Sequence, residues 1–389
     1  MENVSSRCGK SDSAPRLRFP EFSGEWMEKK IKEFANCYAG ATPSTKERKY
    51  WENGTIPWLS SGEVNKKHIS FTDNFITKIG YDSCSTKMIP ANTVVMALAG
   101  QGKTRGTVAI TEIELCTNQS LASIVTNETV DDKFLLYYLE TQYSNLRAIS
   151  SGDGTRGGLN LNIINEYSVF LASPPEQKKI AAFFTLLDSR IQKQRQLVES
   201  LKTYKRGVMN KLFDENIEFD KYLKWEKVEE IFKTINDKPY QVQSCSYFQN
   251  GLYDIVDQGK KEIVGFCDYN DKLFIDVPVI IYGDHTTLVK YREKKFIVGG
   301  DGVKLLKSRN SNINLKYLYY ALLRYNIKLE GYKRHFSILK EVSLPIFEKC
   351  IQDEIAKIMT CIDSYIKLHE NKLSSLLSLK SSLLQKMFI

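Results

Sequence analysis

The sequence lacks the long apolar segments that a membrane protein needs. In its 389 residues, no uninterrupted apolar run approaches the roughly 20 residues that span a bilayer, and the runs at 94–99 and 180–187 are short. The first 22 residues, MENVSSRCGKSDSAPRLRFPEF, contain no apolar signal core. We therefore expect a cytoplasmic chain with no membrane partner.

The sequence also lacks the cysteine and histidine patterns of metal sites. Its eight cysteines include no C-x-x-C pair, and its four histidines do not accompany them at ligand spacing. We expect no metal site, and we expect the cysteines to be reduced, buried thiols.

A nucleotide-binding motif is absent as well. Residues 100–104 (GQGKT) end like a phosphate-binding loop, but the glycine that such a loop needs five residues before Gly102 is Ala97. The following residues, 107–110 (TVAI), predict a strand where that motif requires a helix. This segment therefore predicts a turn between strands.

Two other segments fail as catalytic motifs. Residues 173–176 (SPPE) lack the amide or carboxylate and the aromatic residue that flank the prolines of DNA amino-methyltransferases, and they predict a helix start capped by Ser173. Asp284 with 293–295 (EKK) could form a carboxylate and lysine nuclease pattern, but such short patterns recur readily when 26% of residues are charged. We expect no catalytic residue and no cofactor bound by this chain.

The sequence does contain a long internal repeat. Residues 176–213 match 351–388 without a gap, and the pairs include Asp188 with Asp363 and Lys205 with Lys380. Both copies have the 3.5-residue apolar period of a coiled coil, interrupted at Gln194 and Lys205 and again at His369 and Lys380. The expected seam residues are Ile180, Phe184, Leu187, Ile191, Val198, Leu201, Ile355, Met359, Ile362, Ile366, Leu373 and Leu376.

Two long helices that pair with each other follow from this period. Their orientation is open from the residues alone, although antiparallel pairing follows if a two-fold axis relates the halves. Polar seam residues commonly fix the register of such helices at some cost in stability.

The repeat continues upstream with gaps, and it divides the chain. Residues 26–31 resemble 225–231, and 133–138 resemble 316–321. Short apolar runs between Gly, Asn and Thr turns predict a mixed α/β (α+β) domain with substantial sheet in each half. The expected parts are a tail at 1–20, a first globular domain at 21–173, a helix at 174–213, a second globular domain at 214–347 and a second helix at 348–389.

The loops of both halves combine Gly with amide, hydroxyl and basic side chains. Such side chains can position a phosphate backbone and read base edges, and a net charge of +9 favours a polyanionic partner, although Gly, Asn and Ser also simply make turns. The candidate DNA-binding residues are Ser44, Thr45, Lys46, Ser60, Ser61, Lys66, Gln101, Lys103, Thr104, Arg105, Asn118, Gln119, Arg156, Asp284, His285, Thr286, Thr287, Lys290, Lys304, Arg334 and His335.

In this order, several segments resemble one family. They are 16–26 (RLRFPEFSGEW), 42–45 (TPST) with 56–58 (IPW), 174–180 (PPEQKKI), 282–286 (YGDHT) with 300–303 (GDGV), and the duplicated helices. Over nearly its whole length the chain resembles specificity subunits of type I restriction-modification systems. One departure is that 347–355 (FEKCIQDEI) lacks the double proline before the second helix.

The resemblance implies two target-recognition domains separated by an antiparallel pair of conserved-region helices. Each domain would read one half of a bipartite site in double-stranded DNA, and the helices would set the unread spacer. It also implies two modification subunits, which use S-adenosylmethionine to methylate adenine, and motor-nuclease restriction subunits, which use ATP and magnesium. Two unlike reading surfaces on a pseudo-symmetric frame suit an asymmetric sequence. The chain by itself would not be an enzyme.

Two other hypotheses stay open. The chain could be a coiled-coil assembly adaptor whose globular halves bind proteins, or a self-sufficient nuclease. Salt-titrated DNA binding separates the first from a DNA reader, because phosphate contacts impose a steep loss of affinity with salt.

Overall fold

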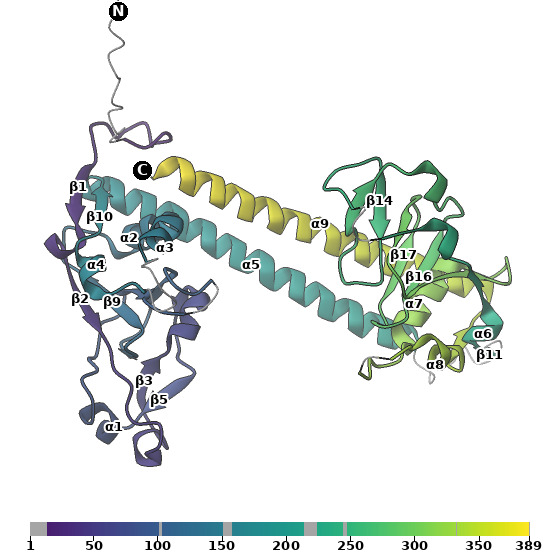
Figure 1. Cartoon of the computed structure of the whole chain (residues 1–389), viewed down its shortest axis with the longest axis horizontal. Coiled ribbons are helices and arrows are strands. Elements are labelled where there is room, and N and C mark those ends of the chain that lie inside the picture. The colour runs from purple at the N-terminus through teal and green to yellow at the C-terminus, as the bar shows by residue number, and fades with distance from the viewer. Residues whose placement is uncertain are drawn as a thin grey trace, which may run out of the picture. The chain divides into compact units, whose positions relative to one another are not determined.

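The structure is a computed structural model that describes residues 14–100, 103–150, 158–213, 224–243, 247–331 and 333–388. It divides into two compact units: unit 1 comprises Met1–Gln194 and Lys372–Ile389, and unit 2 comprises Arg195–Asn371. Two long helices, α5 (Pro174–Leu212) and α9 (Lys349–Met387), each contribute to both units (Figure 1). Across the described ranges, every helix is too short or too polar to span a bilayer.

Unit 1 is built on a five-stranded sheet in the order β2-β9-β6-β7-β4, in which only the β7–β4 pair is parallel. A three-stranded sheet, β5-β3-β8, and a two-stranded sheet, β1-β10, complete it. The strands are β1 (Met27–Lys30), β2 (Ala35–Ala39), β3 (Ile56–Leu59), β4 (His68–Ile69), β5 (Asn74–Ile76), β6 (Val94–Ala97), β7 (Val108–Thr111), β8 (Cys116–Thr117), β9 (Leu121–Thr126) and β10 (Ser168–Leu171). The shorter helices are α1 (Lys78–Asp82), α2 (Asp132–Thr141), α3 (Tyr143–Ile149) and α4 (Leu161–Asn165), with 3-10 turns at Ile31–Glu33, Arg48–Tyr50 and Ser61–Lys66.

Unit 2 repeats this plan. Its sheet β12-β19-β16-β17 has the order of β2-β9-β6-β7, and β11-β20 corresponds to β1-β10. The strands are β11 (Lys224–Lys227), β12 (Phe232–Ile235), β13 (Gln241–Val242), β14 (Tyr253–Val256), β15 (Gly265–Cys267), β16 (Val279–Gly283), β17 (Val289–Arg292), β18 (Ile297–Gly299), β19 (Val303–Ser308) and β20 (Ser343–Ile346), with β13-β18-β14-β15 forming a second sheet. The shorter helices are α6 (Val228–Ile231), α7 (Leu315–Tyr325) and α8 (Phe336–Lys340), with 3-10 turns at Lys238–Tyr240 and Asn270–Lys272.

The same polar residues start the domain helix of each unit. Asp131 accepts hydrogen bonds from the first backbone N–H groups of α2, and Asn314 does the same for α7. The buried Gln177 of α5 then accepts a hydrogen bond from the Asp131 N–H at 2.9 Å, and Gln352 of α9 accepts one from the Asn314 N–H at 2.8 Å. The repeat is therefore preserved where each long helix joins its domain.

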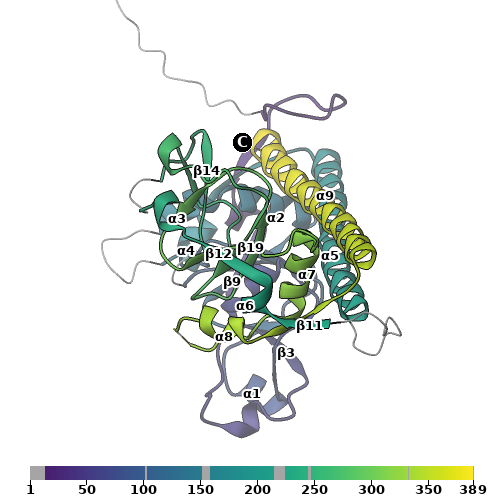
Figure 2. The ribbon, with the colours of Figure 1, turned by 90° about the vertical axis from the view of Figure 1, so that its right-hand side faces the viewer.

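The long helices run antiparallel within each unit (Figure 2). In unit 1, Phe184 of α5 packs on Phe388, the residue after α9, with ring centroids 5.8 Å apart, and Asp188 pairs with Lys380 of α9. In unit 2, Lys202 lies 3.1 Å from Glu370, and Lys205, about one turn further along α5, pairs with Asp363, about two turns earlier in α9. Residue numbers thus rise along α5 as they fall along α9, and every expected seam side chain is buried or half-buried.

Each unit has its own apolar core, completed by the end of one long helix. Phe388 packs edge-on against Trp26 in unit 1, and Phe213 stacks on Tyr317 in unit 2. The predicted α/β architecture with an internal repeat and two long antiparallel helices is confirmed. The two units do not follow the predicted domain borders, which kept each long helix whole. Each long helix is instead divided between the two units.

Candidate nucleic-acid interface

The polar loops of unit 1 meet at one edge of its three-stranded sheet, β5-β3-β8. Strands β3 and β8 are parallel, so the segments that follow Leu59 and Thr117 leave the same edge. The Asn118 N–H donates to the Leu59 carbonyl at 3.0 Å, and the Ala41 N–H donates to the Thr117 carbonyl at 3.0 Å. Gly40 is required here, because a Cβ at this position would lie 1.8 Å from the Thr117 oxygen.

A further loop joins this group. The Leu98 N–H donates to the Ser120 carbonyl at 2.8 Å, and Thr42 donates its hydroxyl hydrogen to the Gln119 amide oxygen at 2.5 Å. We call residues 40–46, 60–62, 98–100, 103–106 and 118–120 loop cluster 1. Its exposed candidates are Ser44, Thr45, Lys46, Lys103 and Gln119, and its half-buried candidates are Ser60, Ser61, Thr104, Arg105 and Asn118. The candidates Gln101 and Arg156 lie outside the described residues.

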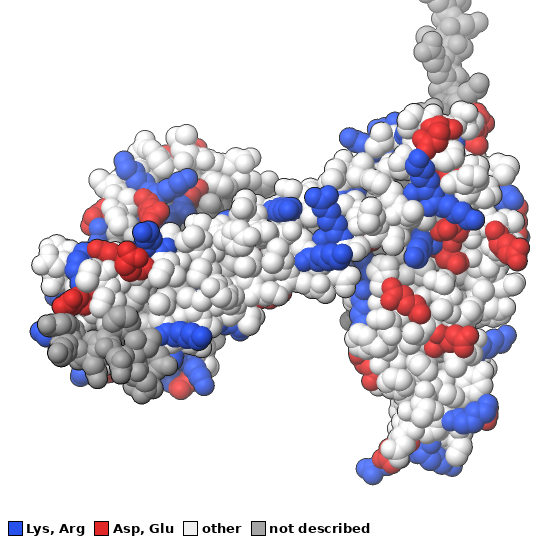
Figure 3. Space-filling model, turned by 180° about the vertical axis from the view of Figure 1, so that it is seen from behind, with Lys and Arg blue, Asp and Glu red and all other residues white. Residues whose placement is uncertain are grey.

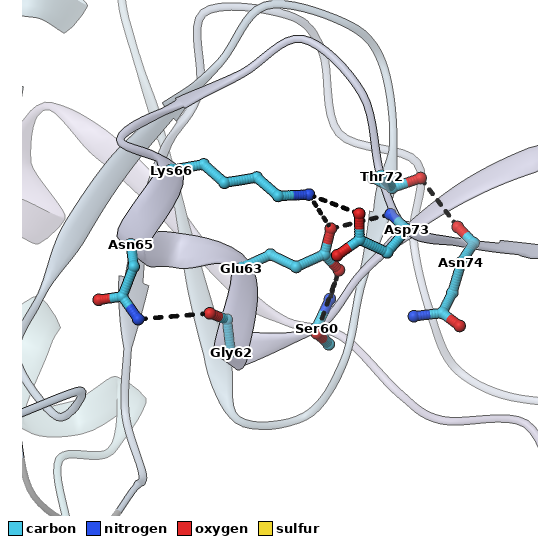
Figure 4. A network of polar contacts seen from close by, with 8 residues as sticks. All are labelled: Ser60, Gly62, Glu63, Asn65, Lys66, Thr72, Asp73 and Asn74. Atoms are coloured by element: carbon cyan, nitrogen blue, oxygen red, sulfur yellow. Dashed lines mark hydrogen bonds and ion pairs between the residues drawn. The ribbon is translucent and has the colours of Figure 1, made fainter. Parts of the chain in front are cut away.

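Lys66 holds a loop instead of extending into solvent (Figure 4). Its ammonium group lies 2.8 Å from both Glu63 and Asp73, and hydrogen bonds to Asp73 and Glu63 raise the pKa of Lys66. The buried Glu63 also accepts hydrogen bonds from the Ser60 hydroxyl and N–H and from the Asp73 N–H. Sequence reasoning missed Glu63, although Ser60 and Glu63 have the spacing of a capping box.

Unit 2 brings its loops together around Gln258. The Gln258 amide group donates to the Asp301 carbonyl at 2.8 Å and accepts from the His285 N–H at 3.0 Å. Gln241 adds a hydrogen bond to the Asp301 carboxylate at 2.9 Å, and the Asp284 N–H donates to the Gly302 carbonyl at 2.7 Å. We call residues 241–243, 257–259, 283–287 and 299–302 loop cluster 2. Sequence reasoning missed both glutamines, and no local pattern marks them.

Several candidates of unit 2 lie inside the domain, contrary to the surface position expected of direct DNA contacts. The buried Asp284 accepts hydrogen bonds from the Phe336 N–H at its carboxylate and from the His335 N–H at its carbonyl, both at 2.8 Å. The imidazole of His335 is fully buried and contacts the Glu330 N–H at 3.2 Å. These groups hold the start of α8 against loop cluster 2.

Lys290 and Thr287 are buried as well. The Lys290 ammonium donates to the carbonyls of Asp257 and Lys261 at 2.8 and 2.6 Å, and burial lowers the pKa of Lys290. Thr287 donates its hydroxyl hydrogen to the Thr286 carbonyl at 2.7 Å. Of the remaining candidates, Arg334 is exposed, and His285, Thr286 and Lys304 are half-buried.

On the face drawn in Figure 3, charge alone does not mark a reading face. Lys and Arg lie among Asp and Glu over the face drawn in Figure 3. Among the residues that the structure describes, no group of three or more His, Cys, Asp or Glu is placed to hold a metal ion. The expectation that the cysteines are buried is wrong for Cys350 and Cys361, which are exposed because they lie on α9 at positions outside its apolar seam.

Comparisons with known proteins agree on one family. The sequence matches the type I restriction modification DNA specificity domain twice, over residues 23–203 and 222–378. It is 28% identical over 313 residues to the type I restriction enzyme MjaIX specificity subunit of Methanocaldococcus jannaschii, covering 75% of this chain and 70% of that protein. It is 25% identical over 175 residues to the EcoR124I/EcoR124II specificity subunit of Escherichia coli, covering 44% of this chain and 43% of that one.

Solved structures share the fold. The S subunit of a type I restriction-modification system from M. genitalium superposes with a TM-score of 0.65 at 18% identity, covering 97% of this chain and 99% of that one. A chain from a study of assembly and conformational transition in the type I R-M system gives a TM-score of 0.55 at 15% identity, covering 93% and 97%. With two matches that together span most of its length, the chain belongs to the type I restriction modification DNA specificity domain family.

Proposed function

We propose that this chain is the specificity subunit of a type I restriction-modification complex and reads a bipartite, asymmetric DNA site. The observation that carries the proposal is that the two units share one strand order, β2-β9-β6-β7 and β12-β19-β16-β17, but present two unlike loop clusters. Loop cluster 1 exposes Lys46, Lys103 and Gln119, whereas loop cluster 2 is organised around Gln258. Each unit then reads one half-site through its own loops, because unlike surfaces recognise unlike sequences.

An exchange of the first globular half tests this assignment. Replacing residues 26–173 with the matching segment of a relative should change one half-site of the methylated sequence and leave the other unchanged. Methylome sequencing of cells carrying the exchanged chain and its partner subunits reports both half-sites. An unchanged target sequence would overturn the proposal.

A point variant tests the role of loop cluster 1. Lys46→Ala should weaken DNA binding by the chain with its modification subunit and reduce the slope of log affinity against log salt by about 1, because one phosphate contact is lost. Lys193→Ala removes another exposed lysine, on α5 outside the cluster, and serves as the matched control. Equal slopes for both variants would exclude Lys46 from the interface.

We infer that catalysis belongs to partner subunits, with S-adenosylmethionine bound by two modification subunits and ATP and magnesium used by restriction subunits. The long helices offer surfaces for that assembly, because Leu186 of α5 and Tyr365 and Leu368 of α9 are 73%, 50% and 61% exposed. Leu368→Glu should reduce the amount of modification subunit that elutes together with this chain in size-exclusion chromatography. Lys367→Ala, at the adjacent exposed position, should not. Full recovery with Leu368→Glu would remove this face from the assembly surface.

A further inference from the structure

A buried ionic cluster in unit 1 joins its domain to both long helices. The ammonium group of Lys380 on α9 lies 2.7 Å from the Asp188 carboxylate on α5 and 3.5 Å from Glu140 on α2. Tyr137 of α2 donates its hydroxyl hydrogen to Asp188 at 3.0 Å, and the Lys380 ammonium lies 5.2 Å from the centre of the Tyr137 ring. The Lys380 side chain is 7% exposed, so this charge is held almost wholly inside the protein.

Unit 2 contains the same cluster with the helices exchanged. Lys205, now on α5, lies 2.5 Å from Asp363 on α9. Tyr320 of α7 donates to Asp363 at 2.8 Å, and the Lys205 ammonium lies 5.6 Å from the centre of its ring. Lys205 and Lys380 are the lysines that interrupt the apolar seam at equivalent positions of the repeat.

Stability alone does not explain an ion pair with a buried lysine, Lys380, and a half-buried pair, Lys205 with Asp363, in an apolar seam. Taking charges out of water is costly, and apolar replacement of a whole buried pair is often neutral or stabilising. A polar seam residue is instead well suited to specifying one register among several. We propose that the two Tyr-Asp-Lys clusters fix the heptad register in which α5 and α9 pair, and we call them the register clusters.

In the neighbouring registers, the sequence leaves at least one of the two lysines without a carboxylate opposite it. A slip of one heptad in one direction would face Lys205 with Ala356 and Lys380 with Ala181, both of which are buried, so that neither lysine has a counterion. A slip in the other direction would face Lys205 with Glu370 but Lys380 with Arg195. Both lysines find a carboxylate only in the observed register.

The register has a consequence that rests on the proposed function. One heptad moves a helix by about 10 Å along its partner, at 1.5 Å per residue. That distance corresponds to about three base pairs of DNA, at 3.4 Å per step along each strand. The register clusters then select one spacer length between the half-sites.

A carbodiimide cross-link measures the register without reference to DNA. The reagent joins an amine and a carboxylate in contact, so the wild-type chain should yield a Lys202–Glu370 cross-link between the helices. The Lys349–Asp353 pair, with 3.1 Å between its charged groups within α9, gives a cross-link that register cannot change and serves as the internal reference. Mass spectrometry of the digested chain gives the ratio of the two products.

Two sets of substitutions address the clusters. The apolar variant combines Asp188→Leu, Lys380→Met, Asp363→Leu and Lys205→Met, and it should keep a thermal midpoint at or above that of the wild type while the cross-link ratio falls by about threefold or more. The one-helix variant, Asp188→Lys with Lys205→Asp, places like charges opposite each other and should lower both the midpoint and the ratio. Adding Asp363→Lys and Lys380→Asp on α9 should restore both.

The outcomes are distinct. A wild-type cross-link ratio in the apolar variant would overturn the proposal, because the apolar seam would then suffice to fix the register. Failure of the two-helix exchange to restore the ratio would also overturn it. The spacer preference of the apolar variant, bound to its modification subunit, is measured on DNA substrates lengthened or shortened by three base pairs. If the cross-link ratio falls but this preference stays that of the wild type, the register clusters do fix the helix register, and the spacer role in the proposed function is wrong.

Discussion

Replacing Glu63 with glutamine should loosen the loop that carries Ser60 into loop cluster 1. One carboxylate oxygen of Glu63 accepts the Ser60 N–H and hydroxyl hydrogen at 3.1 Å, and the other accepts the Lys66 ammonium at 2.8 Å and the Asp73 N–H at 2.9 Å. The glutamine side chain would have the same shape but only one acceptor oxygen. Its amide nitrogen would therefore face two donors.

The expected cost follows from those contacts. A hydrogen bond to a charged group contributes about 1.5–3 kcal/mol, and a buried donor left unpaired costs about 1–3 kcal/mol. Lys66 keeps its contact with Asp73 and is 28% exposed, so water offsets part of its loss. We expect Glu63→Gln to lower the free energy of local opening by about 2–3 kcal/mol.

Native-state hydrogen exchange of the Ser60 and Asp73 amides measures this opening directly. The matched control is Glu112→Gln, because Glu112 is 49% exposed and contacts only the half-exposed His68, at 3.1 Å, among the ion pairs of the described residues. Its effect should stay below about 0.5 kcal/mol. A change below that value for Glu63→Gln, with protection of both amides retained, would refute the reasoning.

Three further predictions concern other parts of the chain. Phe388→Ala should lower the stability of unit 1 by about 3–5 kcal/mol in chemical denaturation, because a buried aromatic ring is removed, and an effect below about 1 kcal/mol would show that the core closes without it. Burial raises the pKa of Cys37 to about 11, so iodoacetamide near neutral pH should modify Cys37 more slowly than the exposed Cys350, as mass spectrometry would report. A hydrogen bond from Lys30 is the main cause that lowers the pKa of Glu166 from 4.5 to about 2. The contribution of ionised Glu166 to folding stability is therefore fully present above pH 4.5 and is lost as the pH falls through about 2. Glu166→Gln should flatten the plot of thermal midpoint against pH in that range.

The long helices and the repeat could be predicted because their signal is local. A 3.5-residue apolar period specifies a paired helix wherever it occurs, and the Pro174-Pro175 pair indicates where the first helix begins. The antiparallel orientation needed the structure, because it depends on which ends meet, as Phe184 and Phe388 do in unit 1.

The burial of loop side chains could not be predicted in the same way. Asp284 and His335 lie far apart in the sequence, and only the fold places the His335 N–H against the Asp284 carbonyl. In the sequence, Lys290 has the pattern of a basic loop residue. In the structure it lies on β17, and its ammonium group donates hydrogen bonds to the carbonyls of residues 257 and 261. Composition indicated that the loops were polar, but it could not separate side chains that face solvent from those that hold the loops in place.

The two halves agree where a long helix meets its domain and differ in what the loops present. Gln177 and Gln352 make the same hydrogen bond to the start of the domain helix, and Asp188 and Asp363 pair with equivalent lysines. These contacts depend on the domain through the first turn of α2 or α7, one tyrosine in each and, in unit 1, Glu140 of α2. A replacement domain that supplies those few groups can therefore join the same frame whatever its loops contain, which separates the choice of half-site from the register of the helices.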